Sequence, residues 1–109
     1  MNKVTQKRQI ETIEVDPFDS KDYQKEILNK IMENSKTTKV ILYLHYIKPT
    51  NKYYKRIAKV IIQKKSKSIV IEYISDSVVF DVLDSLNFKV VDYHNIGGLE
   101  YYYMRKSKS

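Results

Sequence analysis

A run of nine residues near the middle of the chain, 39–47, constrains the fold more than any other segment. It reads KVILYLHYI, is almost continuously apolar and is rich in residues that favour β-structure. A strand of this composition is typical of a mainly parallel sheet whose two faces are both covered. The run therefore predicts a central buried strand in a chain of the α/β class.

The segments on either side predict the remaining elements. Residues 21–35 carry apolar side chains at helical spacing, and residues 9–15 alternate imperfectly but could form a short strand. Pro49 ends the central strand, and helical spacing follows it. The later elements are a helix over 50–63, a strand over 68–74, a helix over 78–86 after a cap at Ser75-Asp76-Ser77, and two strands, 88–93 and 99–104, joined at Gly97-Gly98.

This order predicts a single domain over residues 1–109 with an α/β (α+β sandwich) fold. Its sheet would be mixed and four-stranded, in the order strand-helix-strand-helix-strand-strand, preceded by an extra N-terminal helix with room for an extra strand. Right-handed crossovers would place both crossover helices on one face of the sheet. The polar ends, 1–8 and 106–109, are expected to be flexible.

Composition excludes several classes of function. The 109 residues include no cysteine, which removes disulfides, cysteine-ligated zinc and thiol nucleophiles. No recognised metal spacing, nucleophile motif or phosphate-binding glycine loop is present, so we expect no cofactor, no metal and no enzyme activity. No apolar run approaches the roughly 20 residues that cross a bilayer. We therefore expect a cytoplasmic protein with no membrane partner.

The formal net charge of +7 is unevenly distributed along the chain. Residues 48–67 hold eight basic residues and no acidic one, whereas 68–100 hold six acidic residues and one lysine. On the expected helix, cations three or four residues apart repel one another unless a polyanion neutralises them. This favours a protein that binds backbone phosphates of DNA or RNA with little sequence preference. The candidate contacts are Lys48, Lys52, Lys55, Arg56, Lys59, Lys64, Lys65 and Lys67.

Three other interpretations remain open. The basic residues could form a solvated helix face, or they could dock on an acidic protein partner with tyrosines at the contact. The ten tyrosines could also stack on unpaired bases, pack in the core or contact a second subunit, for which Phe80 is a further candidate. A small metal-dependent nuclease would use His45, Asp76, Asp92 and His94 as ligands.

Residues 38–105 resemble the Alba superfamily, which comprises the archaeal chromatin protein Alba and related RNase P small subunits. The likeness lies in Val40-Ile41-Leu42 leading to Lys48-Pro49, in the expected helix over 51–62 and in the strand at Ser68-Ile69-Val70-Ile71. It implies a homodimer that binds nucleic acid, with Lys48 at the nucleic-acid surface. Ser75-Asp76-Ser77 stands where Alba has a glycine and arginine motif.

Overall fold

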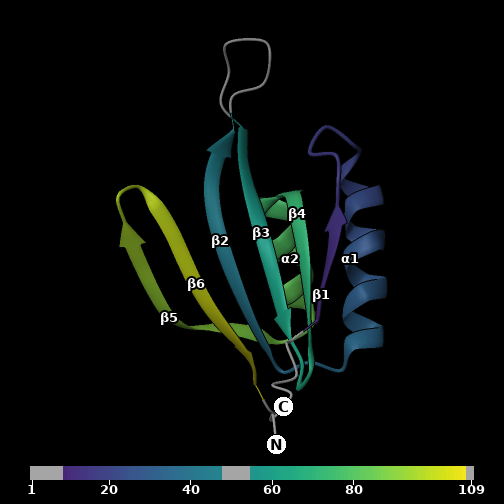
Figure 1. Ribbon diagram of the computed structural model, residues 1–109. Helices are drawn as coiled ribbons and strands as arrows, with labels where there is room; N and C mark the ends of the chain where they lie inside the picture. The colour runs from purple at the N-terminus through teal and green to yellow at the C-terminus, as the bar shows by residue number, and fades with distance from the viewer. Residues whose placement is uncertain (1–8, 48–54, 108–109) are drawn as a thin grey trace, which may run out of the picture.

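The computed structural model describes residues 9–47 and 55–107, with the backbone alone for Ile47 and Lys55. This described part is a six-stranded mixed sheet with two helices (Figure 1). In chain order the elements are β1 (Gln9–Glu14), α1 (Lys21–Ser35), β2 (Lys39–Ile47), β3 (Lys55–Gln63), β4 (Lys67–Ser75), α2 (Asp76–Ser85), β5 (Phe88–Ile96) and β6 (Leu99–Lys106).

The strand order in the sheet is β1-β4-β3-β2-β6-β5. The run at 39–47 is a central strand as predicted, but both of its neighbours, β3 and β6, are antiparallel to it. Only β1 and β4 run parallel. The general α/β class and the mixed sheet are therefore correct, whereas the predicted number of strands and their order are not.

The predicted helix over 50–63 is wrong for its described part, because residues 55–63 form strand β3. Ile57, Val60 and Ile61 fit helical spacing, but Ala58, Val60 and Ile62 also alternate as a strand requires, and all three are fully buried. The β-branched residues in this segment favour the strand. A two-residue turn then leads into β4, with the Lys64 N–H donating to the Lys67 carbonyl at 2.8 Å. This order of elements also departs from the one that the Alba resemblance implies.

The core lies on one face of the sheet, beneath both helices. Leu28 of α1 and Val78 of α2 pack in the same buried cluster as Leu42 of β2 and Ile71 of β4. Gln24 of α1 is also fully buried: its amide donates to the Asp19 carbonyl and accepts from the Ser75 N–H, both at 2.9 Å. In the described ranges no helix covers the opposite face, which we call the open face.

The other predicted elements are confirmed. Helix α1 begins after Ser20, whose hydroxyl accepts from the Tyr23 N–H, and strands β1 and β4 lie where the sequence places them. Gly97 and Gly98, with φ of 59° and 85°, form the two-residue turn between β5 and β6. The segments expected to be flexible lie mostly outside the described residues, but Lys106 and Ser107 donate backbone hydrogen bonds to Thr38 and Asn87.

Candidate nucleic-acid interface

The structure separates the eight predicted contact residues into three groups. Lys48 and Lys52 lie outside the described residues, and for Lys55 only the backbone is described. Arg56, Lys59 and Lys67 each form an ion pair with a carboxylate of the chain itself. Lys64 and Lys65 occupy the turn between β3 and β4 and have no ion pair with any described residue.

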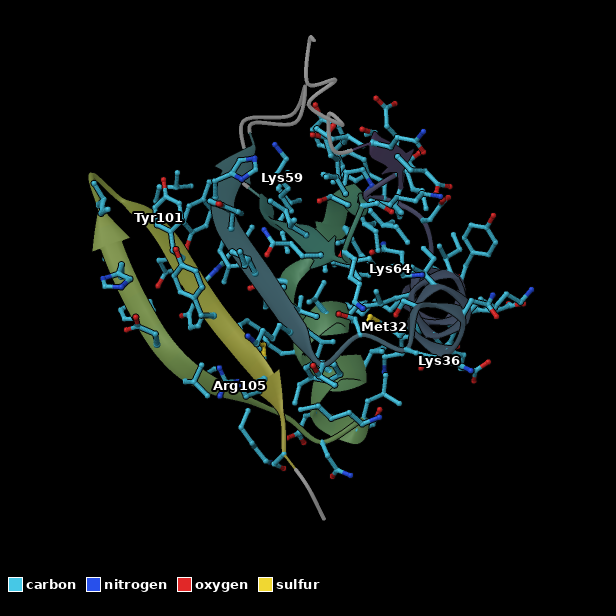
Figure 2. All side chains as sticks on the ribbon, turned by 60° about the horizontal axis from the view of Figure 1, so that its bottom comes forward. Met32, Lys36, Lys59, Lys64, Tyr101 and Arg105 are labelled. Atoms are coloured by element: carbon cyan, nitrogen blue, oxygen red, sulfur yellow. The ribbon has the colours of Figure 1, made fainter. Side chains whose placement is uncertain are left out.

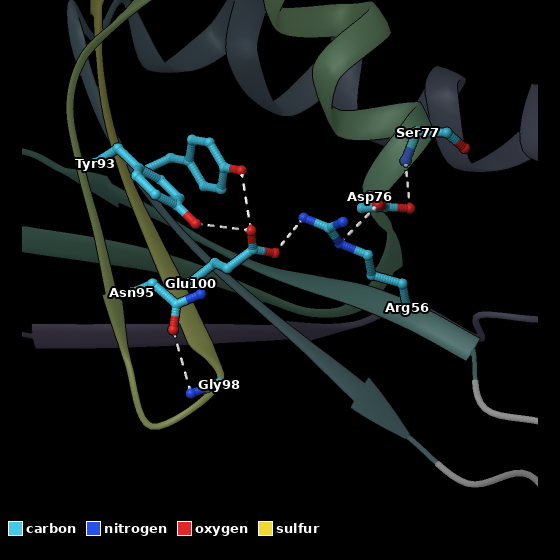
Figure 3. Close-up of polar contacts among 8 residues, drawn as sticks. Arg56, Asp76, Ser77, Tyr93, Asn95, Gly98 and Glu100 are labelled. Carbon is cyan, nitrogen blue, oxygen red and sulfur yellow. Dashed lines mark hydrogen bonds and ion pairs between the residues drawn. The ribbon is translucent and has the colours of Figure 1, made fainter.

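Arg56 lies at the centre of a polar cluster on the helix-covered side of the sheet (Figure 3). Its guanidinium pairs with Glu100 of β6, and its Nε lies 3.1 Å from Oδ2 of Asp76 at the start of α2. Glu100 also accepts from the hydroxyl of Tyr93 at 2.9 Å and from that of Tyr102 at 3.4 Å. Burial alone would lower the pKa of Arg56, but the carboxylates of Glu100 and Asp76 outweigh it and raise that pKa. Arg56 therefore joins β3, α2 and β6 and is not free to hold a phosphate.

Lys59 and Lys67 are neutralised in the same manner. Lys59 Nζ lies 3.3 Å from Glu72 Oε1 on the neighbouring strand β4, and Lys67 pairs with Glu11 of β1. The expectation that this basic run lacks carboxylate partners is therefore wrong for three of its residues. Glu72 and Glu11 lie on strands adjacent to those of Lys59 and Lys67. Glu100 lies on β6, two strands away from Arg56, and Asp76 begins helix α2.

The cations without a carboxylate partner gather elsewhere, at one end of the sheet. Thirteen lysines and arginines have described side chains, and seven of them form no ion pair with the described part of the chain. Six of these seven lie where α1 ends, β2 begins, β3 turns into β4 and β6 ends. We call this set the basic end: Lys36, Lys39, Lys64, Lys65, Arg105 and Lys106.

This end is the lower edge of Figure 1, and Figure 2 turns it toward the viewer. Figure 2 labels Lys36, which follows α1, Lys64 in the turn after β3, and Arg105 of β6. All six residues except the half-buried Lys64 are exposed. The backbone beneath them is well connected, because the Lys106 N–H donates to Thr38 at 2.8 Å and the Thr37 hydroxyl donates to the Lys39 carbonyl at 3.1 Å.

Two members of the basic end face each other directly. Lys39 on β2 and Arg105 on β6 are cross-strand partners in the antiparallel ladder. Like charges in this position destabilise a sheet. The described part of the chain offers neither of them a carboxylate ion pair, so their repulsion is uncompensated within it.

A hollow of about 350 Å³ lies beside this pair on the open face. Lys39 and Arg105 contribute to its rim, together with Gln63, Asp92 and the ring of Tyr103. The Asp92 carboxylate is already engaged, with Oδ2 lying 3.1 Å from Nε2 of His94. The hollow thus combines two cations with an aromatic ring that is 37% exposed.

Aromatic residues continue from this hollow across the open face. Tyr103 and Tyr101 lie two positions apart on β6, and Tyr43 is the cross-strand partner of Tyr101 on β2. The Tyr43 and Tyr101 rings meet edge to face, with centroids 4.7 Å apart. His94 of β5 meets Tyr103 in the same manner at 6.0 Å. The result is an aromatic row that begins at the basic end.

The residues considered for a nuclease are not brought together. Asp76 pairs with Arg56, Asp92 contacts His94, and His45 lines a separate hollow of about 150 Å³ beside Lys59. Within residues 9–47 and 55–107 no group of three or more histidine or acidic side chains could hold a metal ion. Phe80, considered as a subunit contact, instead packs against the core and meets the Tyr102 ring at 5.3 Å.

Four members of the basic end were missed at the level of sequence: Lys36, Lys39, Arg105 and Lys106. Lys36 and Lys39 lie at the start of β2 or before it, and Arg105 and Lys106 lie at the end of β6. The strand order places all four beside Lys64 and Lys65. The available signal was their position, since all four lie at or next to the ends of predicted elements.

Comparison with known proteins found no match among protein-family models, curated proteins or solved structures. No described helix is long and apolar enough to span a bilayer.

Proposed function

We propose that the protein binds single-stranded nucleic acid, with backbone phosphates at the basic end and bases stacked along the aromatic row. One observation carries this proposal: the cations without carboxylate partners are concentrated at one end of the sheet. Elsewhere every cation whose side chain is described, except Lys21, has a carboxylate partner, as Arg56, Lys59 and Lys67 do. Clustered lysine and arginine side chains of this kind are the electrostatic footprint of phosphate binding.

The aromatic row supports single strands over duplexes. Tyrosines on an open sheet face can stack with unpaired bases, whereas the bases of a duplex already stack with one another. Tyr103 lies beside the Lys39–Arg105 pair, so one nucleotide could place its phosphate on the cations and its base on the ring. Neither contact reads base identity, and we therefore expect little sequence preference.

The test is a binding titration of the full chain against four labelled polymers: oligothymidine, oligouridine, a DNA duplex and polyglutamate. We expect both single strands to bind more tightly than the duplex and the polyglutamate. Polyglutamate binding best would overturn the proposal and favour an acidic protein partner. Equal or better binding of the duplex would overturn the preference for single strands.

A variant pair tests the location of the site. The variant K39Q/R105Q removes two cations of the basic end, whereas K25Q/K30Q removes two cations that are paired with Asp81 and Glu26. Both variants lose the same net charge. We expect the first to weaken single-strand binding and the second to leave it nearly unchanged. Equal weakening would mean that total charge, and not the basic end, governs binding.

A further inference from the structure

The outer edge of β5 is the least covered part of the sheet. β5 is the last strand in the sheet order, and every residue from Lys89 to Ile96 is exposed. Large apolar side chains are included, with Val91 59% and Ile96 67% exposed. Exposed apolar edge strands readily pair with another strand unless a feature of the fold prevents it. A partner for this edge must therefore satisfy both its backbone and its side chains.

The β5–β6 turn determines which backbone groups of β5 are free. In a two-residue hairpin with positive φ at both turn residues, the closing pair Ile96–Leu99 exchanges hydrogen bonds, and such pairs alternate along the ladder. His94 and Asp92 then direct their backbone groups to β6, whereas Tyr93 and Asn95 direct theirs outward. In agreement, the Tyr93 N–H donates to the Asp92 side chain at 2.9 Å instead of to β6.

We propose that two copies of the chain pair antiparallel along this edge, with the two-fold axis at Tyr93. In an antiparallel ladder two outward-facing residues stand opposite each other, so the axis must pass through a residue and not between two. An axis at Asp92 would set two carboxylates opposite each other, which is repulsive. An axis at His94 would set Asp92 opposite the apolar Ile96 of the second copy.

The axis at Tyr93 instead places Asp92 of each copy opposite His94 of the other. These two side chains already attract each other within one chain, where they lie 3.1 Å apart on the same face of β5. The pairing therefore joins four complementary groups. Each Tyr93 N–H exchanges its bond to the Asp92 side chain for one to the Tyr93 carbonyl of the other copy. A bulge between Val90 and Asp92 limits the regular ladder to the hairpin half of β5. We expect this short interface to dissociate on dilution, because it is smaller than the roughly 1,600 Å² of a standard stable contact.

A single introduced cysteine locates the axis, because the chain has none of its own. In the proposed register the two copies of residue 93 have Cα atoms about 5.5 Å apart, within disulfide range. The two copies of residue 96 lie roughly 20 Å apart. We expect Y93C to form a covalent dimer under mild oxidation, and I96C to remain monomeric. Crosslinking at D92C or H94C in place of Y93C would put the axis elsewhere and overturn the proposal.

Charge exchange provides a second test that leaves Tyr93 and its hydrogen bond to Glu100 intact. D92K and H94E each remove the Asp92–His94 contact between the copies, whereas D92K/H94E replaces it with a lysine opposite a glutamate. Sedimentation velocity over a range of concentrations should show dimer for the parent and the double variant, and monomer for each single variant. A parent that stays monomeric throughout, or a double variant no better than the singles, would contradict the proposal. Neither outcome depends on nucleic-acid binding, which is measured separately.

Discussion

Removing the basic end in steps should lower the salt dependence of nucleic-acid binding in steps. The perturbation is a series: the parent with all six cations of the basic end, K39Q/R105Q with four of them, and K39Q/R105Q/K64Q/K65Q with two. Each phosphate neutralised on a single strand contributes about −0.7 to the slope of log K against log salt. If each cation meets one phosphate, the slopes are about −4, about −3 and about −1.4.

These slopes predict measurable losses of affinity. Between about 50 and 200 mM salt, the parent should lose roughly 300-fold in affinity and K39Q/R105Q roughly 50-fold. Fluorescence anisotropy of labelled oligothymidine at several salt concentrations gives each slope directly. The control K25Q/K30Q should keep the parent slope, because those lysines pair with carboxylates on the helices. The reasoning is refuted if the slope does not change along the series, or if the control changes it equally.

The variant K39Q/R105Q, which should weaken binding, should not weaken the stability of the fold. Lys39 and Arg105 are directly opposite each other, and their repulsion costs the sheet a few tenths of a kcal/mol up to about 1 kcal/mol. K39Q/R105Q should therefore unfold at the same urea concentration as the parent or at a slightly higher one. Weaker binding in a variant that is no less stable would separate a binding role from a structural one.

Three other substitutions follow from contacts elsewhere in the fold. Y103L should weaken oligothymidine binding by about 1–3 kcal/mol in an anisotropy titration, while Y103F, which keeps the ring, should bind nearly as the parent does. Q24L leaves the buried Ser75 N–H without its acceptor and should cost about 1–3 kcal/mol in urea unfolding. E100Q removes one of the two charges that hold Arg56, and because the cluster is partly exposed we expect a loss of about 1–3 kcal/mol, measured in the same manner.

Much of the fold could be predicted because the pattern of several segments has one interpretation. The helix over 21–35 shows a single apolar stripe after a serine cap, and the hairpin is marked by two adjacent glycines that both need positive φ. The apolar residues of 55–63, in contrast, fit both the helical period and the alternation of a strand. In that segment tertiary context decides between helix and strand, since a strand pairs with β2 and β4 on its two sides and extends the sheet.

The candidate site was harder to predict, because a count of charges along the sequence does not show which charges pair in space. Arg56 and Glu100 are 44 positions apart, yet they form an ion pair. Lys59 and Glu72 meet because β3 and β4 are neighbours, which required β3 to be recognised as a strand. The sequence predicted Lys64 and Lys65 as cations without carboxylate partners, but it placed them just past the end of a helix whose described part is strand β3.

The location of the unpaired cations has a physical consequence for how a strand of nucleic acid would approach. Most acidic residues of the C-terminal half are engaged: Asp76 and Glu100 with Arg56, Glu72 with Lys59, and Asp84 with Lys89. Their fields are largely cancelled at short range, so the uncompensated positive potential arises at the basic end. Screening confines that potential to about 8–10 Å at physiological salt.

A strand of nucleic acid would therefore be captured first by its phosphates at the basic end. Its bases would reach the aromatic row afterwards, as the nucleic acid extends across the open face from Tyr103 toward Tyr43. This order predicts that Y103L raises the dissociation rate and leaves the association rate nearly unchanged, whereas K39Q/R105Q lowers the association rate. Stopped-flow measurement of both rates would contradict this sequence of events if Y103L reduced association as strongly as K39Q/R105Q.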